Sequence, residues 1–341
     1  MTNNSTKILF MMTLISGVII TISSNSWLGA WMGLEINLLS FIPIMYNNNN
    51  TLSAEASLKY FMIQALASSC IMFTIITWSI FKSPYSSMYE NMMFNMLILP
   101  PLLMKAGGAP FHWWFPSVME GLDWLNCLIL MTIQKLAPLI LISYLLIPNL
   151  YTSTIIILSA LVGSVGGLNQ ISTRKLLTYS SINHLGWMIM AMNINTEMWT
   201  MYFKMYLLLT STILFIIKTH NISFINQLTL LKKEPTTKIL FLSSLLSLGG
   251  LPPFLGFYPK WMVIQNTASN KQIILLLAMV LLTLLTLYYY LRITYSSFLM
   301  LTYQVNWEIN INPKNHFTMM IFAITSLWGL LFCKSNINSF L

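Results

Sequence analysis

The sequence has very few charged side chains for its length. Only 7% of its 341 residues are Asp, Glu, Lys or Arg, whereas a soluble globular domain carries about 25%. Hydrophobic residues make up 56% of the chain, and the mean hydropathy is +0.71. This composition excludes a large soluble domain and indicates a polytopic membrane protein.

The sequence also lacks the residue groups that hold metals, redox cofactors and nucleotides. Its three cysteines, Cys70, Cys127 and Cys333, stand singly in or beside apolar runs, and no CxxC motif or Cys/His cluster occurs. Metal and iron–sulfur sites need such clusters, and dinucleotide or phosphate loops need glycine-rich signatures that this sequence does not contain. No basic run exceeds Lys232-Lys233, which argues against nucleic-acid binding despite a net charge of +9. We therefore expect no cofactor, metal or nucleic acid in this chain.

Long apolar runs dominate the sequence instead. A helix needs about 20 apolar residues to cross a bilayer, and runs of this kind predict an all-α protein with about eleven transmembrane helices. The predicted spans lie near residues 8–24, 27–46, 57–81, 91–115, 121–147, 152–169, 175–193, 197–218, 237–265, 272–303 and 316–334.

Glycine and proline interrupt two of these runs, the fourth and the ninth. The fourth run contains Lys105 and the ninth contains Lys260. If spans one to five and six to ten form two units, each broken span is the fourth of its unit. Because five is odd, the units insert with opposite orientation, as in an inverted repeat. We expect five-helix units at 1–150 and 151–304, followed by a C-terminal loop and a final helix at 305–341.

Lysine and arginine are more frequent in the predicted loops on the N-terminal side of the membrane than in those on the other side. Positive charge collects on the inner face of membrane proteins. The bias therefore predicts an N-terminus in the inner compartment, and the odd number of spans places the C-terminus on the opposite side.

Four charged residues lie deep in predicted spans, namely Glu35, Lys105, Lys135 and Lys260. A charge at the bilayer centre costs roughly 3 kcal/mol on insertion scales, so residues of this kind usually have a role. Burial disfavours the charged form of a side chain and a nearby opposite charge favours it. A lysine with a movable carboxylate partner can therefore gain and lose a proton. A fixed ion pair that sets helix register uses the same residue types, so both interpretations stay open.

Two histidines extend this set. His112 lies in the break of the fourth span, and His184 lies near the middle of the seventh. A neutral imidazole accepts a hydrogen bond at one nitrogen and donates at the other, so it can pass on a proton without holding a charge. A buried histidine that only binds a backbone carbonyl is the alternative.

Six motifs recur in order over most of the chain and carry a family resemblance. They read WMGLEIN (31–37), MKAGGAPFHWW (104–114), QKLAP (134–138), GGLNQ (166–170), YSSINHLGW (179–187) and GGLPPFLGFYPKW (249–261). Together they resemble the antiporter-like membrane subunits of respiratory NADH–ubiquinone oxidoreductase, complex I.

The resemblance implies a role for each matching residue. Glu35 and Lys105 would form the carboxylate–lysine pair of the first half-channel, Lys135 would bridge the two halves, and Lys260 would serve the second half. His112 and His184 would lie on the hydrated axis that joins them.

The resemblance also implies proton translocation coupled to electron transfer from NADH to ubiquinone in the mitochondrial inner membrane. The N-terminus would lie in the matrix and the C-terminus in the intermembrane space. NADH, FMN, iron–sulfur clusters and ubiquinone would bind other subunits. The partners would be the other membrane-arm core subunits, accessory subunits and lipids that include cardiolipin. A stand-alone cation/proton antiporter and a purely architectural membrane subunit are the alternatives.

Overall fold

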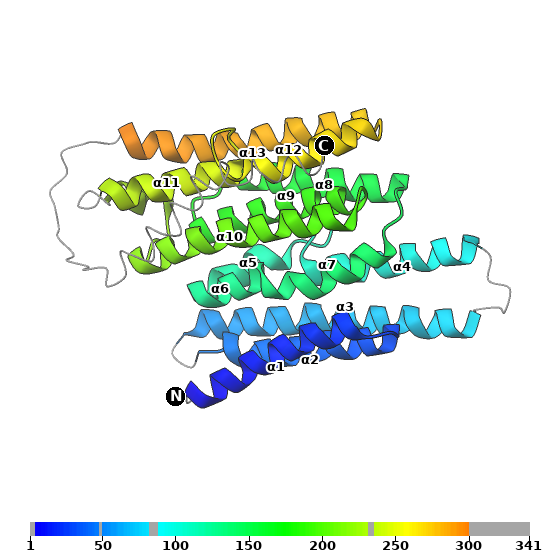
Figure 1. The fold of residues 1–341 in the computed structure, drawn as a ribbon. Helices are drawn as coiled ribbons and strands as arrows, with labels where there is room; N and C mark the ends of the chain where they lie inside the picture. Colours follow the sequence, from blue (N-terminus) through cyan, green and yellow to red (C-terminus); the bar gives the residue numbers. More distant parts are fainter. Residues whose placement is uncertain (1–3, 48–49, 82–87, 231–234, 300–341) are drawn as a thin grey trace. The chain divides into compact units, whose positions relative to one another are not determined.

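The computed structural model describes residues 4–47, 50–81, 88–230 and 235–299, and these residues are almost entirely helical (Figure 1). The chain divides into two compact units, with the boundary between Thr152 and Ser153. The last expected span, near 316–334, lies outside the described residues.

The first unit is a bundle in which neighbours along the chain pack on one another. Helix α1 packs on α2, α2 on α3, and α3 on both α4 and α5, while α7 packs on α4 and α6. The helices are α1 (Asn4–Ser23), α2 (Trp27–Met45), α3 (Thr51–Phe81), α4 (Met88–Ala106), α5 (Trp114–Gly121), α6 (Trp124–Met131) and α7 (Ile133–Leu145).

A glycine lets α1 and α2 approach closely. A Cβ atom on Gly33 would lie 2.5 Å from the Thr21 Cγ2 and 2.8 Å from the Thr21 backbone nitrogen. Any larger residue at Gly33 would therefore push α1 away from α2. The Ser26 side chain caps the start of α2 by accepting a hydrogen bond of 3.2 Å from the Gly29 amide. These two features fix the helix that carries Glu35.

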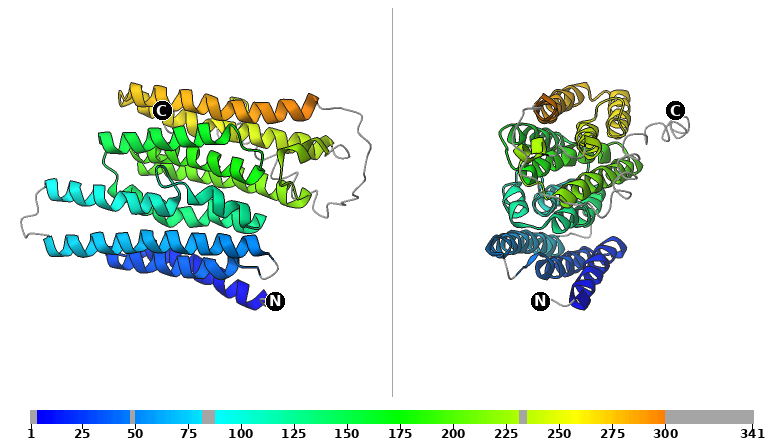
Figure 2. Two further views of the ribbon diagram at one scale, coloured as in Figure 1. Left: turned by 180° about the vertical axis from the view of Figure 1, so that it is seen from behind. Right: turned by 90° about the vertical axis from the view of Figure 1, so that its left-hand side faces the viewer.

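The second unit is built around α10, which packs on α9, α11 and α12, while α13 packs on α11 and α12 (Figure 2). Its elements are α8 (Leu150–Gly167), α9 (Thr173–Met192), α10 (Thr196–His220), a 3-10 helix (Ile225–Leu230), α11 (Pro235–Gly249), α12 (Phe257–Ser269) and α13 (Ile273–Leu299). Nearly all of α9 is buried, so its serine, asparagine and histidine side chains lie inside the unit rather than against lipid.

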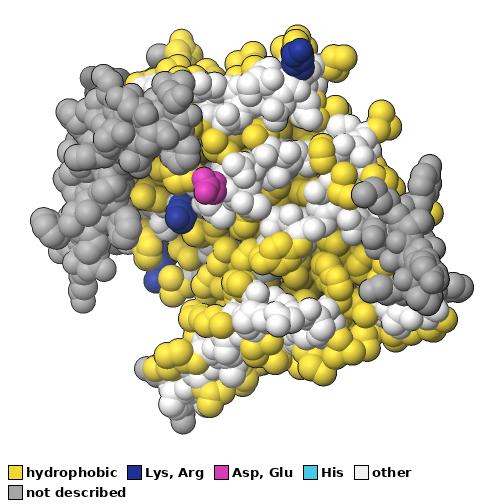
Figure 3. Space-filling view, turned by 45° about the vertical axis from the view of Figure 1, so that its right-hand side comes forward, with side chains coloured by type: hydrophobic (Ala, Val, Ile, Leu, Met, Phe, Trp, Pro, Cys, Tyr) yellow, Lys and Arg dark blue, Asp and Glu magenta, His cyan; other side chains and the backbone are white. Residues whose placement is uncertain are grey.

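Seven helical stretches among the described residues are long and apolar enough to cross a membrane, with α6 and α7 counted together as Trp124–Leu145. Two further apolar helices, α4 and α11, each end at a glycine pair. The surface face in Figure 3 is mostly hydrophobic, with few charged side chains. Exposed leucine, isoleucine, methionine and phenylalanine side chains occur along most of the helices. The expected polytopic, all-helical membrane fold is confirmed.

One predicted span differs in detail. The sequence predicts an unbroken fifth span at 121–147, whereas the chain is interrupted at Thr132 between α6 and α7. The Thr132 hydroxyl donates a hydrogen bond of 2.6 Å to the Leu128 carbonyl. Downstream, Pro138 has no N–H to donate to the Gln134 carbonyl four residues earlier. The side-chain hydrogen bond of Thr132 and the missing N–H of Pro138 weaken the helix here. The surrounding sequence stays apolar, so it gives no sign of the interruption.

Candidate functional site: buried lysines at helix breaks

The two glycine-interrupted helices end in the same cap. At the end of α4, the Gly108 amide binds the Leu103 carbonyl and the Gly107 amide binds the Met104 carbonyl, with Gly107 at a φ of 74°. At the end of α11, the Leu251 and Gly250 amides bind the Leu246 and Ser247 carbonyls in the same way, with Gly250 at a φ of 85°. This pattern is the Schellman motif, which needs glycine at the left-handed position.

Lys105 occupies the last turn of α4, directly before this cap. Its side chain is only 7% exposed, and its Nζ has no hydrogen-bond partner in the described protein. The backbone around it is held firmly, because the Lys105 carbonyl accepts a bond of 3.3 Å from Gln64 Nε2 and the Met104 carbonyl accepts one of 3.0 Å from Trp114 Nε1. A buried amine without a partner is costly, so this position is suited to a change of protonation rather than to structural support.

Glu35 lies near Lys105 but does not form a contact ion pair with it. No ion pair of 4.0 Å or less joins Glu35 and Lys105, yet the two residues are close enough for the Glu35 carboxylate to act electrostatically on the Lys105 ammonium. The carboxylate–lysine pair that the resemblance implies stays a prediction, and in this structure its two members interact over a longer distance than a contact ion pair. Glu35 itself is only partly buried on α2.

His112 lies in the connection that follows the α4 cap. Its Nδ1 is 3.1 Å from the Pro110 carbonyl, and its ring stacks on Trp113 with centroids 5.0 Å apart. The side chain is 9% exposed. The structure thus gives His112 the backbone-carbonyl contact that was the alternative to a relay role, and it leaves Nε2 available for other partners.

Lys135 lies in the first turn of α7, just after the Thr132 break. Its side chain is 1% exposed, and its Nζ lies 4.7 Å from the centroid of the Phe115 ring. An ammonium over an aromatic face gains about 0.5–2 kcal/mol, depending on how far it is desolvated. This helix interruption near Lys135 was not predicted from the sequence.

Lys260 reaches back from α12 to the end of α11. Its Nζ donates hydrogen bonds of 2.8 Å to the Gly249 carbonyl and 3.4 Å to the Leu248 carbonyl. These carbonyls lie at the C-terminal end of a helix, where the backbone dipole favours a positive charge. Lys260 is therefore well supplied with acceptors, whereas Lys105 has none in the described protein.

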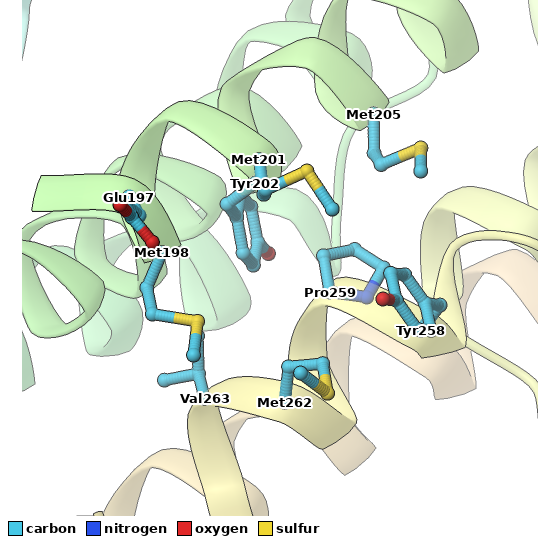
Figure 4. A pocket seen from close by; sticks show the side chains of 9 residues that line it. All are labelled: Glu197, Met198, Met201, Tyr202, Met205, Tyr258, Pro259, Met262 and Val263. Carbon is cyan, nitrogen blue, oxygen red and sulfur yellow. The ribbon is translucent and has the colours of Figure 1, made fainter. Parts of the chain in front are cut away.

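His184 belongs to a cluster of aromatic side chains within the second unit. Its Nδ1 lies 2.9 Å from the Tyr202 hydroxyl, and the centroid of its ring is 5.3 Å from that of Tyr206. Tyr202 also lines a small cavity between α10 and α12, together with Tyr258 and Pro259, which directly precede Lys260 (Figure 4). The other lining residues are Glu197, Val263 and four methionines, so the space is mostly apolar and next to the helix turn that carries Lys260.

The site also contains polar residues that the sequence reasoning missed. Asn37, Tyr60 and Gln134 form a buried hydrogen-bonded chain next to Glu35 and Lys135. The signal was present, because Asn37 and Gln134 are polar residues inside apolar spans and lie two positions from Glu35 and one from Lys135, respectively. No cluster of three or more His, Cys, Asp or Glu side chains suited to a metal occurs among the residues that the structure describes.

Comparison with known proteins supports one family. Residues 24–286 match the family model described as NADH:quinone oxidoreductase/Mrp antiporter, TM. The NADH-ubiquinone oxidoreductase chain 2 of Anopheles gambiae is 54% identical over 329 residues, which is 95% of each chain. The chain 2 of Locusta migratoria is 44% identical over 339 residues, or 98% of each chain. The Bos taurus protein of the same name is 40% identical over 332 residues, covering 94% of this chain and 95% of its own length.

Solved structures share the fold at lower sequence identity. A chain of respiratory complex I from Thermus thermophilus with bound aureothin superposes with a TM-score of 0.84 at 24% identity, covering 98% of this chain and 78% of that one. A chain of the Mrp complex from Dietzia sp. gives a TM-score of 0.76 at 19% identity, covering 83% of this chain and 59% of its own. A family model that covers most of the sequence and close relatives from insects to mammals agree, and this chain belongs to the NADH-ubiquinone oxidoreductase chain 2 family.

Proposed function

We propose that this chain moves protons through its buried lysines, with Glu35, Lys105, Lys135 and Lys260 as the charged stations. As a member of its family, the chain is an antiporter-like membrane subunit of NADH:ubiquinone oxidoreductase. The observation that carries the proposal is that three lysines, each 7% exposed or less, lie at or beside interrupted helices of an otherwise apolar protein. Such interruptions are tolerated at membrane depth only against protein or a wet cavity, and they mark ion paths in transporters.

The three lysines differ in how well their ammonium groups are supported. Lys260 has two carbonyl acceptors and Lys135 has the Phe115 ring. Lys105 interacts electrostatically with Glu35 but has no hydrogen-bond acceptor among the described residues. A movement of Glu35 toward or away from Lys105 would change how strongly this lysine holds its proton. Glu35 is thus placed to load or release the first station. The histidines, His112 in the first unit and His184 in the second, are the relay candidates.

The architecture we propose has about eleven spans in two inverted five-helix units, 1–150 and 151–304, followed by a final segment at 305–341. The identical Schellman caps of α4 and α11, each in the fourth span of its unit, support this arrangement. The greater number of lysines and arginines on the N-terminal side supports a matrix location for the N-terminus and an intermembrane-space location for the C-terminus.

The remaining parts of the proposal concern the assembly. The subunit lies in the mitochondrial inner membrane, beside the other core subunits of the membrane arm and beside accessory subunits and lipids such as cardiolipin. NADH, FMN, the iron–sulfur clusters and ubiquinone bind in other subunits, and this chain contributes no redox chemistry. Its part is to convert a structural or electrostatic signal from that chemistry into proton movement.

Replacement of Lys105 by methionine in the assembled enzyme tests this function. The matched control is Lys59→Met, because Lys59 is 51% exposed on α3 and pairs with Glu55 at 3.5 Å. The proposal predicts fewer protons translocated per NADH oxidised in Lys105→Met and no change in Lys59→Met. An unchanged ratio in both variants would instead support a purely architectural subunit, and ion exchange by the isolated chain in liposomes would support a stand-alone antiporter.

A further inference from the structure

A chain of three neutral polar side chains crosses the apolar interior of the first unit. Asn37 of α2, Tyr60 of α3 and Gln134 of α7 are 3%, 2% and 9% exposed. Tyr60 Oη donates a hydrogen bond of 3.3 Å to Gln134 Oε1, and Gln134 Nε2 donates one of 3.0 Å to Asn37 Oδ1. Gln134 is the centre of the chain, because its amide binds both neighbours at once.

This chain lies directly beside the charged residues. Asn37 follows Glu35 by two residues on α2, and Gln134 immediately precedes Lys135. Buried polar groups that bind one another in this way fix the positions of the helices that carry them, since each loses a partner if one helix moves.

The turn that carries Gln134 and Lys135 is weakly held by its own helix. It begins directly after the interruption at Thr132, and Pro138 cannot donate to the Gln134 carbonyl. One backbone hydrogen bond, of 3.2 Å from the Lys135 amide to the Thr132 carbonyl, still spans the interruption, and side-chain contacts with other helices add to this support. The two hydrogen bonds of the Gln134 amide supply such contacts, one to α2 and one to α3.

We propose that Gln134 is a positioning residue for Lys135, which holds the first turn of α7 against α2 and α3 through Asn37 and Tyr60. This inference rests on the proposed function, because the placement of Lys135 matters only if Lys135 carries protons. Proton transfer depends steeply on distance, and a displacement of about 1 Å can cost on the order of 100-fold in rate. Loss of the bridge would thus impair proton transfer without removing any ionisable group.

The test compares Gln134→Met with Asn126→Leu in the assembled enzyme. Methionine matches the length of glutamine without its polar atoms. Asn126 is the matched control, because it is equally buried at 9% and donates one inter-helix hydrogen bond of 3.1 Å to the Ile44 carbonyl, but it lies before the Thr132 break. The readouts are the number of protons per NADH and the pH profile of proton pumping.

The charged groups that could shape this pH profile sit on the helices packed against α7, namely Glu35 on α2, Lys105 on α4 and Lys7 at the start of α1. Gln134→Met is expected to lower the proton ratio and to move the midpoint of the pH profile by about half a unit or more. Asn126→Leu is expected to change neither. Equal behaviour of the two variants would overturn the proposal.

Two further variants keep the outcomes distinct. If Gln134→Met does not assemble, Tyr60→Phe removes a single hydroxyl from the same chain, and an unchanged pH profile in that variant would overturn the proposal. Lys135→Met separates this inference from the function on which it rests. Full pumping in Lys135→Met would contradict the proposed function itself, whereas impaired pumping there with normal pumping in Gln134→Met would contradict only the positioning role.

Discussion

Replacement of Gly250 by alanine is expected to displace the Lys260 side chain without changing the lysine itself. A Cβ atom at Gly250 would lie 2.9 Å from Lys260 Cδ and 3.0 Å from Lys260 Nζ. The lysine side chain is the flexible partner, so it would move. Its hydrogen bond of 2.8 Å to the Gly249 carbonyl would then be lost or lengthened.

Two effects set the size of the perturbation in Gly250→Ala. The backbone at Gly250 has a φ of 85°, a left-handed conformation that costs a non-glycine residue roughly 1–2 kcal/mol. Loss of a hydrogen bond from a charged donor costs about 1.5–3 kcal/mol. A change of this size is enough to redistribute Lys260 almost completely away from the α11 carbonyls, because about 1.4 kcal/mol corresponds to a factor of ten.

The assay is the number of protons translocated per NADH by the assembled enzyme in proteoliposomes, with assembly checked on native gels. Gly250→Ala is expected to lower this number. Gly249→Ala is the control, because a Cβ there would make only an ordinary contact of 3.4 Å with Tyr290 Cδ2 and needs no unusual φ. If both variants pump like the unaltered enzyme, the reasoning that ties the position of Lys260 to proton transfer is refuted.

Three other substitutions have defined expectations. Tyr202→Phe removes the hydroxyl 2.9 Å from His184 and should cost about 1 kcal/mol of stability, with slower pumping if His184 is a relay and unchanged pumping if it is not. Phe115→Leu removes the ring under the Lys135 ammonium and should destabilise the charged lysine by about 0.5–2 kcal/mol. The pH profile of pumping should then shift, and an unaltered profile would contradict a role of the ring in supporting this charge. Gly33→Val places branched carbon atoms against α1 and should reduce the amount of assembled subunit on native gels, which normal assembly would disprove.

The sequence was sufficient for the membrane class and for both glycine-interrupted helices. Apolar runs of about 20 residues indicate membrane helices, because a helix of this length crosses the bilayer and satisfies its own backbone hydrogen bonds. The glycine pairs at Gly107 and Gly249 are each followed by proline, and they end in caps that only a left-handed residue can form. Local chemistry of this kind can be predicted without knowing the tertiary structure.

The surroundings of the lysines could not be predicted in the same way. The acceptors of Lys260 are backbone carbonyls more than ten residues away, and any residue can provide a carbonyl. The interruption at Thr132 could not be predicted, because apolar residues continue on both sides of it. The separation of the Glu35 and Lys105 charges depends on how α2 and α4 pack. The sequence predicts only that both residues are buried in the same unit.

The most direct test of the lysine route is the proton-to-electron ratio of Lys135→Arg compared with Lys135→Met. Arginine keeps a positive charge and can stack on Phe115, but its guanidinium does not release a proton in proteins. If Lys135 passes protons on, both variants should assemble and both should translocate fewer protons per NADH. Full pumping in Lys135→Arg with impaired pumping in Lys135→Met would show that only a fixed charge is needed, and it would contradict the role of Lys135 as a proton carrier.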